Sequence, residues 1–162
     1  MTYLDLLETV GTRPALVAHR GHWKQAPENS LAAIEAAIVA GADVVEIDIR
    51  MSADCVPMVF HDNDLERMTG QPSAVSDLPL AKLSELGLRA RNGNNSEFTD
   101  QVIPTRDEVF AEFGKSVLFD LDLKEWEACH AILACVERHG MAAHVDLKQP
   151  VRSLNQAKVY MA

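Results

Sequence analysis

The sequence predicts an α/β fold built on a parallel sheet, and three observations support this. Strand-like apolar runs alternate with helical segments, which is the pattern of parallel α/β architecture. The strand candidates are short and almost continuously apolar, as expected when both faces of a strand are covered. With 162 residues and 48% hydrophobic content, the chain can bury one substantial core. We therefore expect a single domain over residues 1–162.

The first strand candidate covers residues 15–19 and ends on His19. After a loop, Asn29 or Ser30 can cap a helix whose apolar residues recur at helical spacing. Gly41 supplies the expected stop of that helix. This order of strand, loop and helix predicts the first unit of the parallel sheet.

The second strand candidate, residues 44–50, carries acidic side chains inside an apolar run. Side chains alternate along a strand, so Glu46 and Asp48 share one face with Arg50 while the apolar residues take the other. Ionisable groups in a covered strand cost desolvation energy, which a bound ion commonly offsets. This strand therefore predicts a polar site on one face of the sheet.

Residues 56–60 predict a short strand that brings His61 to the same end of the sheet. The segment 62–104 is rich in Gly, Asn, Ser, Pro and Asp, with one short helix expected from Asp77 and Pro79. We expect this segment to form a long functional loop or cap.

The strand with acidic residues is repeated later in the chain. After a helix predicted at residues 106–113, the run at 117–124 places Asp120, Asp122 and Lys124 on one face. This run therefore adds further charged groups to the predicted polar site.

A further amphipathic helix is predicted to end at Gly140, and a fourth strand is expected at residues 143–147. Residues 148–162 show no barrel-like pattern. The residues expected on the buried side of the helix are Trp126, Cys129, Leu133 and Val136.

Charge and cysteine content exclude several classes of partner. Acidic residues outnumber basic ones by 24 to 15, so nucleic acids and anionic membrane surfaces are not expected as main partners. No apolar stretch approaches the roughly 20 residues of a membrane-spanning helix, and the N-terminus has no secretory signal. The three cysteines do not have the spacing of metal ligands, which favours a role as small apolar side chains in a reducing cytosol. They are Cys55, Cys129 and Cys135. A cytoplasmic location is predicted.

The charged residues of the strands predict a metal and phosphate site. Glu46, Asp48 and Asp122 could offer three carboxylates to one hard cation, Mg²⁺, Ca²⁺ or Mn²⁺, at about 2.0–2.6 Å. Zn²⁺ fits less well because His and Cys ligands are not gathered. Arg20 and Lys124 could bind phosphate oxygens that also touch the metal.

Two histidines add proton chemistry to this site. Imidazole exchanges protons near neutral pH, so one of His19 and His61 can protonate a leaving alkoxide while the other removes a proton from the attacking group. Either histidine alone would more often be structural, and Asp120 alone would be a buried acceptor or a supporting group. Their occurrence together with the carboxylates favours a catalytic site.

Seven short motifs occur in order between residues 15 and 124. They are His19-Arg20-Gly21, Ala26-Pro27-Glu28-Asn29-Ser30, Gly41-Ala42-Asp43, Glu46-Ile47-Asp48, His61-Asp62, Leu65-Glu66-Arg67-Met68-Thr69-Gly70 and Ile103-Pro104-Thr105. In order and spacing they resemble the glycerophosphodiester phosphodiesterase family. The resemblance implies a TIM-type (β/α)8 barrel that uses a divalent metal to hydrolyse glycerophosphodiesters to glycerol 3-phosphate and an alcohol.

The resemblance also implies a role for individual residues. The segment 62–104 would be the family's insertion beside the second strand, which shapes the glycerol side of the pocket. The metal ligands would be Glu46, Asp48 and Asp122. The acid/base pair would be His19 and His61. Contacts to substrate, or support for them, would come from Arg20, Lys124, Glu28 and Asn29.

Three features depart from the family pattern. Asp122 stands where the pattern has Glu, so the third ligand is shorter by one methylene, about 1.5 Å of reach. Cys55 stands where the family favours Gly, which disfavours a positive φ there. A complete (β/α)8 barrel runs to about 250 residues, so this chain would supply about the first half of a barrel.

A half barrel leaves alternatives open. Its sheet edges need covering, and two copies closing one pseudo-barrel is one arrangement that would do so. A truncated, inactive half-barrel that binds a phosphate ligand or a partner is the alternative function. Among enzymes, a lyase that releases a cyclic phosphate is the alternative to a hydrolase.

Overall fold

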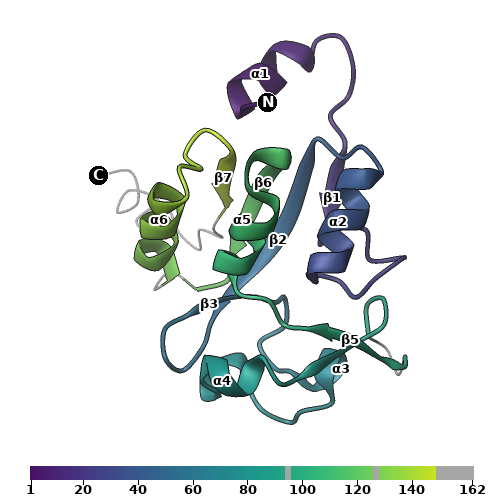
Figure 1. Ribbon diagram of the computed structural model, residues 1–162, viewed down its shortest axis with the longest axis vertical. Helices are drawn as coiled ribbons and strands as arrows, with labels where there is room; N and C mark the ends of the chain where they lie inside the picture. The colour runs from purple at the N-terminus through teal and green to yellow at the C-terminus, as the bar shows by residue number, and fades with distance from the viewer. Residues whose placement is uncertain (94–95, 126–127, 149–162) are drawn as a thin grey trace, which may run out of the picture.

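The main sheet is parallel and runs through the middle of the molecule (Figure 1). The computed structural model describes residues 1–93, 96–125 and 128–148. Within them, the strand order is β1-β2-β6-β7, and β3 pairs antiparallel with β2. The strands are β1 Val17–His19, β2 Val44–Met51, β3 Pro57–Val59, β6 Leu118–Leu123 and β7 Val145–Lys148. The predicted parallel α/β architecture is therefore confirmed.

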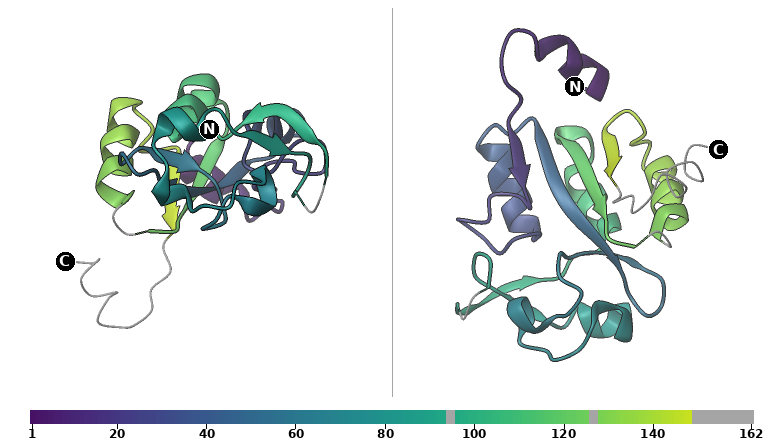
Figure 2. Two further views of the ribbon diagram at one scale, coloured as in Figure 1. Left: turned by 90° about the horizontal axis from the view of Figure 1, so that it is seen from below. Right: turned by 180° about the vertical axis from the view of Figure 1, so that it is seen from behind.

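Helices cover one face of this sheet, as the view from the front (Figure 1) and the view from behind (Figure 2) show. The apolar residues of β2 and β6, such as Ile47 and Leu121, pack against them and form the main core. Of the two residues expected as caps, Asn29 and Ser30, it is Ser30 that caps the first of these helices by accepting a hydrogen bond from the Ala33 amide. The helices are α2 Leu31–Val39, α5 Arg106–Phe113 and α6 Ala128–Arg138.

The buried side of α6 agrees only in part with the predicted one. Val136 is buried and Cys129 packs partly buried against the core, as expected, but Leu133 is 44% exposed, and Ala128, Ile132 and Cys135 enter the core as well. Packing against β2 and β6 therefore buries residues of this helix that the periodicity did not single out. Trp126, which was expected on the buried side, lies outside the described residues.

The segment 62–104 has more regular structure than the loop or cap that its composition predicted. It contains a two-stranded antiparallel sheet and short helices around a hydrophobic cluster, separate from the main core, in which Leu65 and Leu88 pack with Met58 of β3. Pro79, rather than Asp77, precedes the predicted helix, because the Asp77 carboxylate binds the Ala74 amide and closes a 3₁₀ turn. The elements are α3 Glu66–Thr69, the 3₁₀ turn Val75–Asp77, α4 Leu80–Leu83, β4 Gly87–Arg89 and β5 Phe98–Val102.

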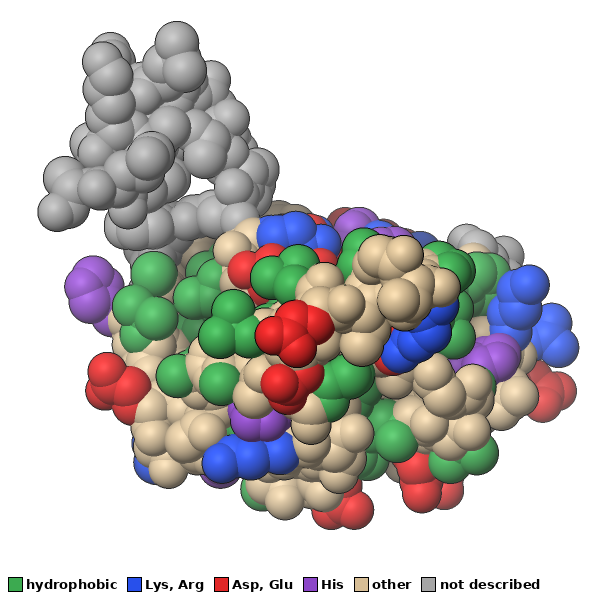
Figure 3. Space-filling view, turned by 90° about the horizontal axis from the view of Figure 1, so that it is seen from above, with side chains coloured by type: hydrophobic (Ala, Val, Ile, Leu, Met, Phe, Trp, Pro, Cys, Tyr) green, Lys and Arg blue, Asp and Glu red, His purple; other side chains and the backbone are tan. Residues whose placement is uncertain are grey.

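An N-terminal helix, α1 (Tyr3–Thr9), lies beyond the amino-terminal ends of the strands. The Tyr3 hydroxyl donates to the Phe119 carbonyl oxygen at 3.0 Å, and Leu6 packs on a small apolar cluster of β2 and β6. Leu4 and Leu7 stay exposed, and hydrophobic side chains are visible at the surface when the molecule is viewed from this end (Figure 3). None of the described helices has the length and apolar character needed to cross a membrane.

Candidate active site

Three carboxylates converge on the face of the sheet opposite the helices. The parallel register pairs Glu46 with Asp120 and Asp48 with Asp122, so alternation along β2 and β6 points their side chains the same way. Oxygen atoms of Glu46, Asp48 and Asp122 all lie within 4.8 Å of one another. The shorter reach of Asp122 therefore does not prevent the convergence that the sequence predicted.

Lys124 lies between two of these carboxylates. Its Nζ is 2.7 Å from Asp48 Oδ1 and 2.6 Å from Asp122 Oδ2. Burial opposes the ionisation of Asp48, but hydrogen bonds from Lys124 and Asn29 outweigh it and hold the pKa of Asp48 below its ordinary value. One ammonium thus compensates part of the negative charge gathered here.

The negative charge of Glu46 is not compensated in the same way, so this side chain tends to hold a proton. It is only 3% exposed, and burial together with the charge of Asp48 raises its pKa to about 7. A cation beside these carboxylates would remove that penalty. Three oxygen donors, two of them buried, fit a hard divalent ion such as Mg²⁺, Ca²⁺ or Mn²⁺.

The turn after β1 brings His19 and Arg20 to the carboxylates. Arg20 has a φ of +58°, and Gly21 follows at +73°, where a Cβ would lie 2.7 Å from the backbone of Ala33. This turn lets the Arg20 amide donate to Glu46 Oε2 at 3.1 Å. His19 Nε2 lies 3.8 Å from the same oxygen, and burial and the charge of Arg20 lower the pKa of His19.

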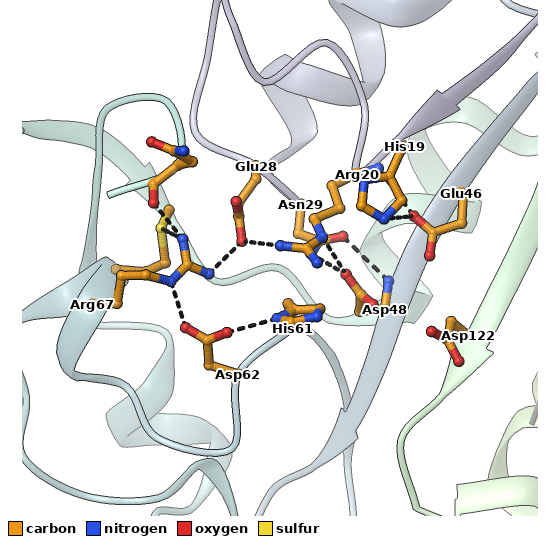
Figure 4. Close-up of polar contacts among 12 residues, drawn as sticks. His19, Arg20, Glu28, Asn29, Glu46, Asp48, His61, Asp62, Arg67 and Asp122 are labelled. Atoms are coloured by element: carbon orange, nitrogen blue, oxygen red, sulfur yellow. Dashed lines mark hydrogen bonds and ion pairs between the residues drawn. The ribbon is translucent and has the colours of Figure 1, made fainter. Parts of the chain in front are cut away.

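His61 is oriented by a carboxylate that the sequence analysis quoted only as part of a motif. Its Nδ1 lies 2.6 Å from Asp62 Oδ1, and Asp62 Oδ2 accepts from Arg67 Nε at 2.6 Å. Because an ionised carboxylate only accepts, Nδ1 donates and Nε2 is left to exchange a proton. His61 and His19 lie on opposite sides of Asp48 (Figure 4). In the sequence, the position of Asp62 directly after His61 is the feature that could have indicated this role.

A line of ion pairs joins the orientation of His61 to the carboxylates. Arg67 contacts Glu28 Oε1 at 2.6 Å, and Arg20 contacts the same oxygen at 3.1 Å. Arg20 Nε in turn lies 3.3 Å from Asp48 Oδ2. Figure 4 shows these side chains in a row from Asp62 to Asp48. Sequence reasoning did not single out Arg67, because its partner Glu28 is distant in the chain.

Glu28 and Asn29 lie beneath the site rather than at its surface. They are 5% and 2% exposed, and Asn29 Nδ2 donates to Asp48 Oδ2 at 2.9 Å. These contacts position Arg20 and Asp48, and the predicted contact of either residue with substrate stays a prediction. Asp120, expected as a buried acceptor or supporting group, pairs with Lys148 of β7 at 2.6 Å.

Comparison with known proteins identifies the family. Residues 19–160 match the profile of the glycerophosphoryl diester phosphodiesterase family. The chain belongs to this family. Glycerophosphodiester phosphodiesterase 1 of Homo sapiens is 35% identical over 123 residues, which cover 74% of this chain and 37% of the human protein. A glycerophosphodiester phosphodiesterase of Caldanaerobacter subterraneus is 34% identical, and the match covers 67% of this chain and 44% of that protein.

Solved structures of the family show the same fold. A glycerophosphodiester phosphodiesterase from Agrobacterium tumefaciens superposes with a TM-score of 0.76 at 28% identity, over 89% of this chain and 60% of that one. An Oleispira antarctica phosphodiesterase in complex with the product sn-glycerol-3-phosphate superposes with a TM-score of 0.74 at 30% identity, over 93% of this chain and 64% of that one. The chain thus forms part of a TIM-type barrel and spans less than half the length of the curated relatives it matches.

Proposed function

We propose that this chain hydrolyses glycerophosphodiesters to sn-glycerol 3-phosphate and an alcohol in a metal-dependent reaction. The observation that carries the proposal is the convergence of Glu46, Asp48 and Asp122 beside two basic side chains and two histidines. The product seen with the Oleispira antarctica relative supports a glycerol phosphate ligand for this chain.

The three carboxylates would hold Mg²⁺, Ca²⁺ or Mn²⁺. When bound, such an ion would polarise the phosphate and lower the pKa of the attacking hydroxyl. Arg20 would bind the non-bridging phosphate oxygens and stabilise charge that develops on them. Lys124 would do the same, since its ammonium already lies beside two of the acids and can turn to an incoming anion.

The two histidines would move the protons. His61, held by Asp62 through Nδ1, presents Nε2 for proton exchange, and the carboxylate stabilises the ring after it has taken a proton. The lowered pKa of His19 favours its neutral form near pH 7. One ring would accept a proton from the attacking group while the other protonates the leaving alkoxide.

The Glu28–Arg67 pair would preserve this arrangement without touching the reacting atoms. It fixes Asp62 from one side and Arg20 from the other. We treat residues 1–162 as one domain in which the segment 62–104 is an insertion that shapes the glycerol side of the pocket. Its separate hydrophobic cluster supports that division.

The test is product analysis with the purified chain. Glycerophosphocholine is incubated with each of the three ions, and phosphorus NMR follows the products. We expect sn-glycerol 3-phosphate, and His61→Ala should slow its release by about 10²–10⁴-fold. His130→Ala is the matched control, because His130 is an exposed histidine of α6. A cyclic phosphate would support the lyase alternative, and the absence of any product would contradict the enzymatic proposal.

One observation favours a second candidate, a homo-oligomeric binding module. Val17 of the edge strand β1 is 51% exposed, and Leu16 just before it is 53% exposed, which is unusual for apolar residues at a parallel strand. Pairing with a second copy would cover them and close a pseudo-barrel. Light scattering distinguishes a monomer from an oligomer, and a monomer at micromolar concentration would contradict this candidate.

The cytoplasmic location stays a prediction from the cysteine content.

A further inference from the structure

A second set of metal-ligating side chains lies on the helical side of the sheet. Asp107 belongs to the first turn of α5, Cys135 lies on α6, and His139 follows directly after that helix. One ligand atom from each lies within 4.8 Å of the other two. Cys135 packs in the core formed with the apolar face of β2 and β6, so this cluster and the carboxylates occupy opposite faces of the sheet.

The Asp107 carboxylate connects the other two ligands. Cys135 Sγ donates to Asp107 Oδ1 at 2.8 Å, and His139 Nε2 lies 2.9 Å from the same oxygen. In a tetrahedral zinc site, Zn–S of about 2.3 Å and Zn–O or Zn–N of about 2.0 Å separate the ligand atoms by about 3.5 Å. A shift of the Asp107 side chain by less than about 1 Å would therefore open the required space.

Helical spacing and packing hold the ligands in place. Cys135 and His139 are four residues apart, and the His139 amide still donates to the Cys135 carbonyl oxygen, so their side chains share one side of the helix. The imidazole also contacts the Phe110 ring edge-on, with the centroids 5.9 Å apart. Two of the three ligands thus need no rearrangement of the backbone.

Exposure is graded across the cluster. Cys135 is fully buried, while the side chains of His139 and Asp107 are 24% and 46% exposed, so water can complete a tetrahedral set from the solvent side. Arg138 and Arg106 are competing cations: Arg138 lies 2.9 Å from both oxygens of Asp107, and the buried Arg106 acts on the same carboxylate by its charge. Arg106 is held away from the ligands because its Nη1 donates to the Ile132 carbonyl oxygen. The Arg138 side chain is 61% exposed and can turn into solvent.

We propose that Asp107, Cys135 and His139 bind a divalent ion of the zinc class. A thiolate and an imidazole prefer a borderline-soft ion, in contrast to the all-oxygen set of Glu46, Asp48 and Asp122. The Cys135 thiol loses its proton to the solvent as Sγ bonds to the metal. The bound ion would join α5 to α6.

Titration of the whole chain with Co²⁺ tests this site. We expect about one equivalent to produce a thiolate-to-cobalt charge-transfer absorption, which Zn²⁺ abolishes by displacement and excess Mg²⁺ does not. Cys135→Ala should remove the band, and His139→Gln should weaken Co²⁺ binding by at least about tenfold. Cys129→Ala is the matched control, because it removes a second thiol of the same helix and should leave the band unchanged.

The cobalt titration can overturn the proposal in several ways. A folded chain that shows no thiolate band would do so, as would a band that survives Cys135→Ala or one that disappears in Cys129→Ala. Because Cys135 is part of the core, its replacement can destabilise the fold. His139 is less buried than Cys135, and His139→Gln retains all three thiols. An unchanged affinity for Co²⁺ in this variant would therefore also contradict the site.

Discussion

The two faces of β2 are both buried but are stabilised in different ways. On one face, Ile47 and Ile49 are fully buried against the helices. On the other, Glu46 and Asp48 are almost as buried, yet they depend on Lys124 and neighbouring polar groups. Apolar burial stabilises without conditions, whereas buried carboxylates stabilise only while their charges are matched. The apolar face therefore supports the fold, and the charged face depends on its ligands.

The largest expected effect is on the apolar face. Phe119→Ala removes a fully buried ring that packs on Phe110 with centroids 5.5 Å apart. We expect the free energy of unfolding to fall by about 4 kcal/mol, because the cavity adds to the lost transfer energy. Urea denaturation measures it, and the difference from wild type should be the same with and without saturating Mg²⁺, because the ion stabilises both proteins equally. A smaller difference in Mg²⁺ would mean that the two faces are not independent.

Removing the ammonium from the charged face should behave differently. Lys124→Met removes the ammonium that Asp48 and Asp122 share, and without divalent ions we expect a loss of about 3 kcal/mol in the free energy of unfolding. Mg²⁺ at saturating concentration should recover most of this loss, since it replaces the missing charge. Lys82→Met, at an exposed ion pair of α4, is the control and should change little. Equal losses with and without Mg²⁺ would argue against a cation site.

The raised pKa of Glu46 predicts a pH dependence. The folded state holds the proton up to about pH 7 and the unfolded state only to about pH 4.5, so stability without metal falls as the pH rises between these values. The loss is about 3 kcal/mol for this shift. Denaturation at pH 5 and pH 7.5 measures the free energy of unfolding of wild type and of Glu46→Gln, and the difference between the two proteins isolates the contribution of Glu46. Saturating Mg²⁺ should abolish the dependence, and a pH-independent difference without metal would contradict the shift.

The smallest expected effect is at the exposed turn between β2 and β3, which belongs to neither face. Cys55 is exposed and has a φ of +61°, the conformation for which the family pattern favours Gly. Cys55→Gly should raise the free energy of unfolding by about 0.5 kcal/mol, because relief of a strained φ exceeds the added chain entropy. Cys55→Ala also removes the thiol but keeps the strain, so only the glycine variant should raise the melting temperature. A gain in both variants would point to the thiol instead.

The sequence alone determined the elements and residues whose signals are local. Alternation along residues 44–50 placed Glu46 and Asp48 on one face, and the capping residues Asn29 and Ser30 marked the start of α2, of which the structure uses Ser30. Motif order in turn pointed to the family that the profile match shows. These features depend on residues within a few positions of one another, which is why periodicity and capping reveal them.

Only the tertiary structure decided which distant groups meet. It paired Arg67 with Glu28, brought Asp107 to Cys135 and His139, and chose which apolar side of α6 is buried. It also organised the segment 62–104 around its own hydrophobic cluster. The physical reason is that these contacts join residues far apart in the chain, where packing and charge neutralisation select among arrangements that local propensity leaves nearly equal.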